Sequence, residues 1–433
     1  MKVLAIDIGS SSVKCAILHS RRIVGGVVRT TFPTLVDGPK VEVEAASVRQ
    51  AVVDAIARVG RRAKDADVIA IDVMAPSFLL MDRKGEALTN AITHQDRRSI
   101  DAARAIEKRV GRARHLRLAG NRPVPGGISS TSFAWLKSHE SARLKKADLA
   151  GHLLTYLHRH LTGARVIDPS VASFSGVYST ITQKGWNDEL CDAVGMSKHL
   201  LPEIREGNEV AGRITRDAAS RFGLGEGTPV LTGVIDGSCG MLVAGAVAGR
   251  VMNVCGSTDV LAVCTDNPKP NENLLTRALG VGKLWVYVAN IPAAGSAVLW
   301  AKHTLFADLP EASFYRLIAK LSRSSIAGDL TFDPRLAGSR TQIESLRGGI
   351  AGLTLSTTRE MILSALLDSL ARTSADRVHL IQTHCKQIDH NCLVTGGLAK
   401  NLSHLLHRDW PGKWKFRYVE EATLLGLGVL AGS

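Results

Sequence analysis

The amino-acid sequence predicts an α/β protein of two domains, in which the second domain repeats the fold of the first around a central cleft. The chain has 433 residues, more than the roughly 250–300 at which a single hydrophobic core stops growing. A strand–polar turn–strand pattern spans Val3–Leu18 and returns at Val251–Cys264, which indicates a duplicated unit. We place the boundary near residue 243, so that residues 1–242 form the N-terminal domain and residues 243–433 the C-terminal domain.

In the N-terminal half, short apolar runs alternate with segments of helical periodicity. The apolar runs predict strands at Val3–Ile8, Val13–Leu18, Arg22–Val28, Asp67–Val73 and Thr228–Gly233. The helical spacing predicts helices at Val43–Val59 and Ser238–Ala248, and a helical region from Ser132 to His160 that includes the amphipathic run Leu144–Leu161. The polar residues Gly9–Ser12 between the first two strands predict a hairpin turn.

The C-terminal half repeats the opening hairpin and ends in further strands and helices. Predicted strands Val251–Cys255 and Val260–Cys264 flank the turn Gly256–Asp259. Near the end, the strand Cys392–Thr395 runs into Gly396-Gly397, and a helix with Leu398, Leu402, Leu405 and Leu406 on one side follows. The strand Phe416–Val419 and the small-residue helix Glu421–Leu430 complete the chain.

Composition and charge favour a globular protein of a reducing cytoplasm. The mean hydropathy is +0.07, and no apolar run reaches the roughly 18–20 residues of a membrane-spanning helix. The seven cysteines are widely spaced without a C-x-x-C pattern, which disfavours disulfide and zinc frameworks. The net charge of +14 raises a nucleic-acid hypothesis. The densest basic stretch, Arg104–Arg117, has no aromatic residue for base stacking, so we expect neither a nucleic-acid nor a membrane partner.

The first candidate site is the turn after the first strand, from Asp7 to Lys14. A carboxylate inside an apolar strand is unfavourable unless it is paired or meets a metal ion. Gly9 allows a ligand close to the backbone, and the amides and hydroxyls of the following serines can donate to phosphate oxygens. The alternative is an ordinary hairpin turn that Asp7 caps.

The second candidate is Asp236, in the loop Gly233–Gly237 between a strand and a small-residue helix. Aspartate is a favoured N-cap, which is the structural alternative. Phosphoryl transfer to an alcohol, however, needs a carboxylate that accepts the hydroxyl proton. Asp236 precedes the second hairpin, where such a base would be needed.

Two weaker motifs follow in the C-terminal half. Gly256-Ser257-Thr258 offers a small residue, two hydroxyl groups and backbone donors at a tight turn. Gly396-Gly397 is a strand-to-helix turn where a nucleotide could lie against bare backbone, although Gly-Gly also punctuates many loops.

The order and spacing of these four motifs resemble those of the FGGY carbohydrate kinases, members of the actin-like ATPase superfamily, over nearly the whole chain. Asp7–Lys14 resembles the family's first phosphate loop, Gly233–Gly237 its catalytic loop, and Gly256–Thr258 its second phosphate loop. Gly396–Asn401 resembles the adenosine segment, and Glu421–Gly426 the C-terminal signature helix. The resemblance implies two RNase H-like domains, with the sugar bound mainly by the N-terminal one and MgATP mainly by the C-terminal one.

The resemblance also implies roles for individual residues. Asp236 would act as the general base and contact the sugar, Asp96 and Arg97 would bind sugar, and Asp7 would help to hold Mg²⁺. The nucleotide would be bound by Gly9, Ser10, Ser11, Ser12, Lys14, Gly256, Ser257, Thr258, Gly396, Gly397 and Asn401.

The expected substrate is a ketopentose such as xylulose. Leu161-Thr162-Gly163, Asp168–Ser173 and Gly227–Val230 resemble the xylulokinase branch more than the glycerol kinase branch. Three features depart from the family: the C-terminal half is short, Gly-Ser-Thr stands for Gly-Thr-Ser, and Ala75-Pro76 stands where xylulokinases carry Met-His. Because Ala-Pro offers no side-chain hydrogen bond, we expect relaxed specificity among ketoses or a shift to another one.

Several alternatives stay open at this point. Glycerol, gluconate or a deoxyketohexose could replace the ketopentose as the substrate. A non-catalytic ATP switch of the actin/Hsp70 type would share the two phosphate hairpins, but it has no need of the Gly233–Gly237 loop or of Asp96-Arg97. The oligomeric state is open, with a homodimer as one alternative.

Overall fold

The computed structural model describes residues 1–432, and these fall into two compact units. The first unit contains Met1–Ala246, Asp266–Val286 and the segment from Glu421 onward, and the second contains Val247–Thr265 and Tyr287–Glu420. Two segments of the C-terminal half therefore belong to the first unit, while the boundary at residues 242/243 stays a prediction. Within residues 1–432, no helix combines the length and apolar character that crossing a membrane requires.

The first unit is built on a mixed sheet of seven strands in the order β12-β13-β6-β1-β2-β3, with β14 also paired to β6. The central strands β1, β6, β13 and β14 run parallel, whereas β1, β2 and β3 form antiparallel neighbours. The strands are β1 (Lys2–Ile8), β2 (Ser12–His19), β3 (Arg22–Thr31), β6 (Val68–Val73), β12 (Val210–Arg213), β13 (Pro229–Leu231) and β14 (Val234–Ile235). The predicted strands of this half and the opening hairpin are thereby confirmed.

Alternation along β1 assigns its side chains to two different hydrophobic cores. Leu4, Ile6 and Ile8 join the core beneath α1 (Ala45–Val59) and α7 (Leu153–Leu161). Val3 and Ala5 join a second core with residues of α11 (Asp236–Ala244) and α16 (Ala422–Leu430). Asp7 continues the second series, so its carboxylate belongs to the sheet face that α11 and α16 cover.

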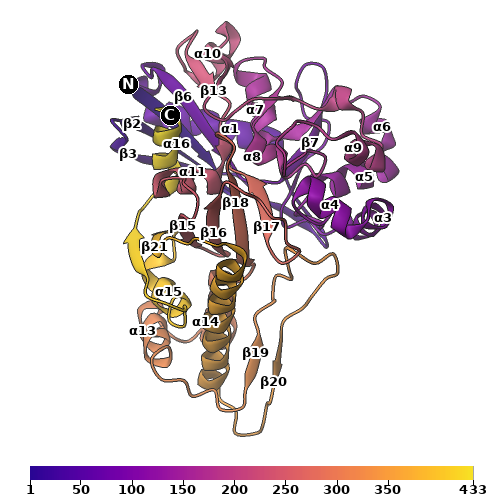
Figure 1. Cartoon of the computed structure of the whole chain (residues 1–433). Helices are drawn as coiled ribbons and strands as arrows, with labels where there is room; N and C mark the ends of the chain where they lie inside the picture. The colour runs from indigo at the N-terminus through magenta and orange to yellow at the C-terminus, as the bar shows by residue number, and fades with distance from the viewer. Residues whose placement is uncertain (433) are drawn as a thin grey trace. The chain divides into compact units, whose positions relative to one another are not determined.

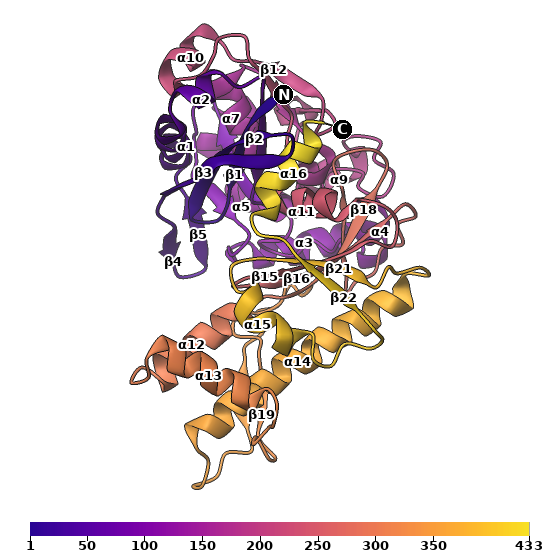
Figure 2. The same cartoon turned by 90° about the vertical axis from the view of Figure 1, so that its left-hand side faces the viewer.

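The C-terminal helix α16 lies against β1 and β2 in the first unit, as Figure 2 shows. Its Gly426 permits a close approach to α11, since a β-carbon on Gly426 would lie 2.2 Å from the carbonyl oxygen of Cys239. The helix predicted at Glu421–Leu430 is confirmed. The helix predicted at Ser238–Ala248 begins two residues earlier and ends at Ala244.

A smaller sheet of the first unit corrects one sequence-based prediction. Its order is β4-β5-β8-β7-β9. The predicted helical region from Ser132 to His160 is interrupted by β9, which pairs with β7 through Phe78–Met81. The pattern failed here because a partner strand far away in sequence overrides local propensity. The strands are β4 (Leu35–Asp37), β5 (Lys40–Val43), β7 (Ser77–Met81), β8 (Ala91–Thr93) and β9 (Leu149–His152).

Short elements complete the first unit. The helices are α2 (Arg61–Lys64), α3 (Ile100–Val110), α4 (Arg112–Ala119), α5 (Ser129–His139), α6 (Ser141–Leu144), α8 (Pro169–Ala172), α9 (Asp188–Val194), η1 (Lys198–Leu200) and α10 (Arg216–Phe222). The strands are β10 (Val166–Ile167), β11 (Glu203–Ile204) and β17 (Leu275–Ala278).

The second unit repeats the hairpin-plus-parallel-strand arrangement. Its strands follow the order β18-β16-β15-β21-β22, with β15 antiparallel to β16 and parallel to β21. Figure 1 shows the long helix α14 beside β19, which forms a separate ribbon with β20. The elements are β15 (Val251–Cys255), β16 (Asp259–Thr265), β18 (Trp285–Ile291), α12 (Gly295–Leu305), α13 (Glu311–Leu321), β19 (Thr331–Asp333), β20 (Gly349–Ala351), α14 (Arg359–His384), β21 (Asn391–Thr395), α15 (Ala399–Leu406) and β22 (Lys415–Tyr418).

Candidate active site

Three carboxylates meet at one edge of the seven-stranded sheet. Asp7 on β1 is in register with Asp72 on β6, and β6 pairs on its other side with β14, which Asp236 follows directly. These strands are parallel, so their carboxyl ends lie together, the place where open α/β sheets bind ligands. The register therefore brings two of the predicted site residues, Asp7 and Asp236, to one location.

Asp236 is the first residue of α11 and remains partly exposed. Its Oδ1 atom accepts the backbone N–H of Gly237 at 2.6 Å. Burial, and after it the neighbouring charge of Asp7, raises the pKa of Asp236 to about 6. A carboxylate with such a pKa is ionised at neutral pH and takes up a proton readily, which suits a general base.

A buried hydrogen-bond chain holds the strand that carries Asp236. The Ile235 amide donates to Ser170 Oγ at 2.9 Å, and that hydroxyl donates in turn to Asp168. Asp168 also accepts the Ser170 amide at 2.7 Å as the N-cap of α8. Gly233 completes the loop at φ +82, where a β-carbon would lie 2.2 Å from the carbonyl oxygen of Ile71. Asp168 and Ser170, in the stretch Asp168–Ser173 that the resemblance singled out, therefore hold the predicted catalytic loop in place.

Asp72 was missed by the sequence-based site prediction. Its carboxyl is fully buried, and neither oxygen has a hydrogen-bond partner within residues 1–432. Burial, followed by the charges of Asp7 and Asp236, raises its pKa well above the ordinary value. The signal was available, since an aspartate inside the apolar run Val68–Val73 is the same feature that singled out Asp7.

The first hairpin turn presents backbone donors beside Asp7. The Gly9 amide donates to the Ser12 carbonyl at 3.0 Å and closes the turn. Ser10 and Ser11 are exposed, and within residues 1–432 their amides have no acceptor. Lys14 on β2 lies opposite Asp7, with its Nζ atom 3.5 Å from the Asp7 Oδ2 atom. The backbone N–H groups of this turn and the Lys14 ammonium group can together bind an anion.

The second hairpin turn lies in the second unit and is anchored by backbone hydrogen bonds. The Gly256 amide donates to the Thr258 carbonyl at 3.1 Å, and the Ser257 carbonyl accepts the Ala294 amide at 3.0 Å. The Thr258 hydroxyl donates to the Pro292 carbonyl at 3.0 Å. Ser257 is exposed, so its hydroxyl is the more accessible of the two predicted phosphate donors.

Gly396 and Gly397 lie next to this second hairpin but differ in their surroundings. Gly396 has φ +106, and a β-carbon there would lie 2.3 Å from the carbonyl oxygen of Cys255. At Gly397 a β-carbon would meet nothing within 4 Å. Asn401 is exposed on α15. The structure thus places the predicted second phosphate loop and the predicted adenosine turn side by side within one unit.

Asp96 and Arg97 lie in a loop after β8 of the smaller sheet. Asp96 is buried and accepts both the Val41 amide at 2.8 Å and the Arg98 guanidinium, whose Nη2 atom lies 2.6 Å away. Arg97 Nη1 donates to the Pro125 carbonyl at 2.9 Å. The carboxylate of Asp96 is therefore engaged within the protein, and a contact with sugar stays a prediction.

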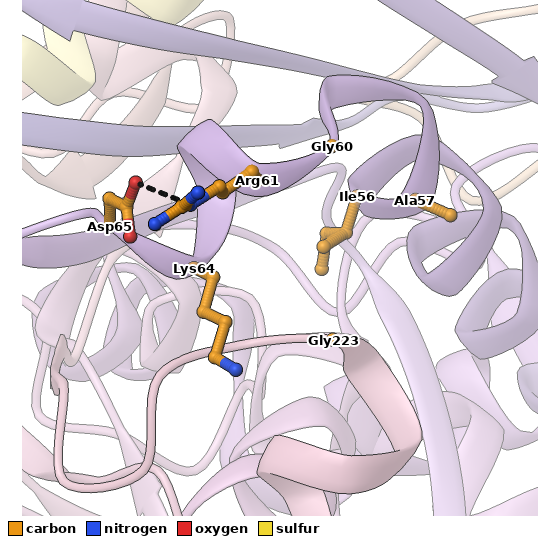
Figure 3. Close-up of a pocket in the computed structure, with 7 residues that line it drawn as sticks. All are labelled: Ile56, Ala57, Gly60, Arg61, Lys64, Asp65 and Gly223. Atoms are coloured by element: carbon orange, nitrogen blue, oxygen red, sulfur yellow. Dashed lines mark ion pairs between the residues drawn. The ribbon is translucent and has the colours of Figure 1, made fainter.

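One surface pocket lies away from all of these residues. Figure 3 shows it between the ends of α1, α2 and α10, with Gly60, Lys64 and Gly223 among its lining residues, and its volume is about 500 Å³. Its residues lie in the segment before β6, apart from Gly223, which precedes β13. The carboxylates instead lie at the carboxyl ends of strands, Asp7 and Asp72 near the ends of β1 and β6 and Asp236 directly after β14. The pocket therefore belongs to the opposite edge of the sheet and lacks the chemistry of the site.

Comparison with known proteins identifies the architecture. Residues 2–243 match the N-terminal domain model, and residues 251–405 the C-terminal domain model, of the FGGY family of carbohydrate kinases. A xylulose kinase of Bacillus subtilis is 26% identical over 92% of this chain and 81% of its own length. A glycerol kinase of Thermococcus kodakarensis is 26% identical over 99% of this chain and 88% of its own length. The crystal structure of a Rhodospirillum rubrum xylulose kinase superimposes with a TM-score of 0.88 at 21% identity, over all of this chain and 90% of the other.

Proposed function

Since the chain belongs to the FGGY family of carbohydrate kinases and has their two-domain actin-like ATPase fold, we propose that it transfers the γ-phosphoryl group of ATP to a hydroxyl group of a ketopentose such as xylulose. The observation that carries this proposal is the position of Asp236. Asp236 is partly exposed and stands at the carboxyl edge of the sheet, where β6 separates its strand β14 from β1, the strand that carries Asp7.

The proposed reaction needs one proton acceptor. Asp236 takes the proton of the attacking hydroxyl group, the sugar oxygen forms a bond to the γ-phosphorus, and the bond from that phosphorus to the bridging oxygen breaks. The products are the sugar phosphate, ADP and a proton held on Asp236. Backbone amides of the turns at Ser10-Ser11 and Gly256–Thr258 would donate to phosphate oxygens.

Magnesium fits this site as a companion of the nucleotide. Within residues 1–432, no group of three or more His, Cys, Asp or Glu side chains is arranged to hold a metal ion. Mg²⁺ commonly needs only one or two carboxylates besides phosphate oxygens and water, and Asp7 supplies such a carboxylate at the turn. The bound ion would neutralise charge on the phosphate oxygens.

Two xylulose kinases that each match 92% of this chain support xylulose as the substrate. The run Asp168–Ser173, which resembles the xylulokinase branch, also supports it, because Asp168 and Ser170 hold the Ile235 amide next to Asp236. The test is sugar-dependent ADP formation with ketopentoses, deoxyketohexoses, gluconate and glycerol. We expect the highest kcat/KM with a ketopentose. A clearly higher kcat/KM with glycerol or gluconate would contradict the ketopentose assignment. A rate of ADP formation that is the same with and without every sugar would favour the actin/Hsp70-type ATP switch.

The sugar role of Asp96 can be separated from its structural role. Asp96→Asn is expected to raise the KM for the ketose more than the KM for ATP, because one charged acceptor of sugar hydroxyls is lost. Removing a partner from a buried ion pair also destabilises a protein. Glu42→Gln is the matched control, because Glu42 pairs with the same Arg98 at 2.8 Å. Equal KM changes in both variants would assign Asp96 to the ion pair alone.

Gly397 provides a test of nucleotide binding. Gly397→Val is expected to raise the KM for ATP while leaving the KM for sugar and the melting temperature nearly unchanged. The reason is that a β-carbon here would meet no atom within 4 Å, so the valine side chain would instead occupy space proposed for the nucleotide. The readout is a set of steady-state kinetics with each substrate varied. Equal changes in both KM values, or none, would count against adenosine binding at this turn.

A further inference from the structure

Glu421 has an unusual backbone conformation and a specific side-chain contact. Its φ of 49° and ψ of 40° place it in the left-handed region, which residues other than Gly, Asn and Asp rarely adopt because of crowding at the β-carbon. Its carboxylate accepts the ammonium group of Lys14 at 2.7 Å, across 407 residues of sequence. A strained backbone that persists beside a ligand-binding turn points to a function for the side chain.

Two residues further along, the same segment contacts Asp7, the residue opposite Lys14 in the first hairpin. The Thr423 hydroxyl donates to Asp7 Oδ2 at 2.7 Å. Lys14 Nζ lies 3.5 Å from that same oxygen but only 2.7 Å from Glu421 Oε2. The lysine is therefore drawn to the C-terminal segment, and the Asp7 carboxylate receives a neutral hydrogen bond there.

The position of this segment is fixed by packing. Leu424, Leu427 and Leu430 are buried in the core beneath β1 and β2. Gly426 lets α16 lie directly on α11, the helix that begins with Asp236. The side chains at the start of α16 are thus held by a rigid element, as a site that must keep its geometry requires.

We infer that Glu421 is a positioning residue of the phosphate site, which holds the Lys14 ammonium off the Asp7 carboxylate so that both groups stay available to Mg²⁺-bound phosphates. This inference rests on the proposed function, which assigns Lys14 to the nucleotide and Asp7 to Mg²⁺. Lys14 bridges the two carboxylates, with its closer contact to Glu421 and a longer ion pair of 3.5 Å to Asp7. Without the Glu421 carboxylate, we expect the flexible lysine side chain to shorten its ion pair with Asp7, which would occupy both groups at once.

The physical alternative has the opposite sign. A carboxylate at the phosphate site repels the triphosphate, so its removal could strengthen nucleotide binding. Lys14 is 21% exposed and Glu421 29% exposed, so neither charge is strongly screened by water. The direction of the change in affinity therefore distinguishes a residue that positions Lys14 from one that competes with phosphate for it.

The test is the affinity of the full-length protein for the non-hydrolysable analogue AMP-PNP with Mg²⁺, measured by calorimetry without sugar. Glu421→Ala is expected to raise the Kd about tenfold, the usual loss for a hydrogen bond between charged groups. Glu421→Gln keeps an oxygen acceptor for Lys14 and should lose less. Adenosine, which has no phosphate, should bind all variants equally.

Glu421→Gly separates positioning from fold stability. Glycine adopts the left-handed conformation freely, so this variant should melt at the same or a higher temperature than the unsubstituted protein while losing AMP-PNP affinity as Glu421→Ala does. The neighbouring Glu420→Ala is the control. Glu420 forms an exposed ion pair with Lys400, so this variant should bind AMP-PNP normally.

Three results would overturn the inference: unchanged or tighter AMP-PNP binding by Glu421→Ala, an equal loss of adenosine affinity, or losses that follow the melting temperature across the series. The proposed function fails by a different result. An unsubstituted protein that binds AMP-PNP but phosphorylates no sugar would refute the sugar kinase assignment, while the comparison of affinities at residue 421 would still decide the role of Glu421.

Discussion

Asp236→Asn is expected to lower kcat by about 10²–10⁴-fold, the usual contribution of a general base, while the affinity for MgATP stays nearly unchanged. Asparagine has almost the same shape as aspartate but cannot take up the hydroxyl proton. The variant should therefore bind both substrates and fail at the chemical step. Single-turnover phosphorylation at saturating substrate measures this loss directly, and near-normal turnover would refute the role.

The pH dependence of the unsubstituted protein supplies a second signature. With a pKa of about 6, Asp236 becomes protonated as the pH falls through 6, and kcat/KM should fall with it because a protonated carboxyl cannot accept the proton. The acidic limb should vanish in the residual activity of Asp236→Asn. A limb that persists in the variant would assign it to another group.

Stability should change in the opposite direction to activity. The pKa of Asp236 is higher in the folded protein than the roughly 3.9 of an unfolded chain. Its contribution to stability is therefore most favourable at low pH and is lost as the pH rises through 6. At pH 8, Asp236→Asn should unfold at the same or a higher temperature than the native chain. Asp72→Asn is the contrasting variant, because the Asp72 side chain is fully buried, whereas Asp236 is partly exposed.

Gly396→Ala is expected to destabilise the second unit by about 2–5 kcal/mol, because backbone strain and steric overlap act together. Gly396 has φ +106. A β-carbon would lie 2.3 Å from the Cys255 carbonyl oxygen and 2.7 Å from its carbon. Cys255 ends β15, which is held between β16 and β21, so neither backbone can move away cheaply.

The adjacent glycine is the matched control for this loss. Gly397→Ala adds the same methyl group where nothing lies within 4 Å and φ is not positive, so we expect little change in stability. Urea unfolding followed by tryptophan fluorescence, to which Trp300, Trp410 and Trp414 of the second unit contribute, compares the two variants. Equal midpoints for Gly396→Ala and Gly397→Ala would show that the turn accommodates a side chain at either position.

The predicted site came partly from local signals and partly from resemblance. Asp7 was singled out as a charge in an apolar strand, and the register places it at the same sheet edge as Asp236. Asp72 carried the same local signal and was overlooked. For Asp96, resemblance suggested a sugar contact, whereas the structure shows an ion pair with Arg98, and only the kinetic comparison with Glu42→Gln will separate these roles.

The sequence by itself determined the two hairpins, the strand that contains Asp7, the strand that precedes the Asp236 loop, and the glycine turn before α15. Their signals are local, since apolar runs, polar turns and glycines act over a few residues. Only the tertiary structure decided that β9 interrupts a helical pattern, that Asp72 joins Asp7, and that Glu421 and Thr423 reach Lys14 and Asp7. These contacts join segments up to 416 residues apart, and no short-range pattern records which distant side chain will be packed against a strand end.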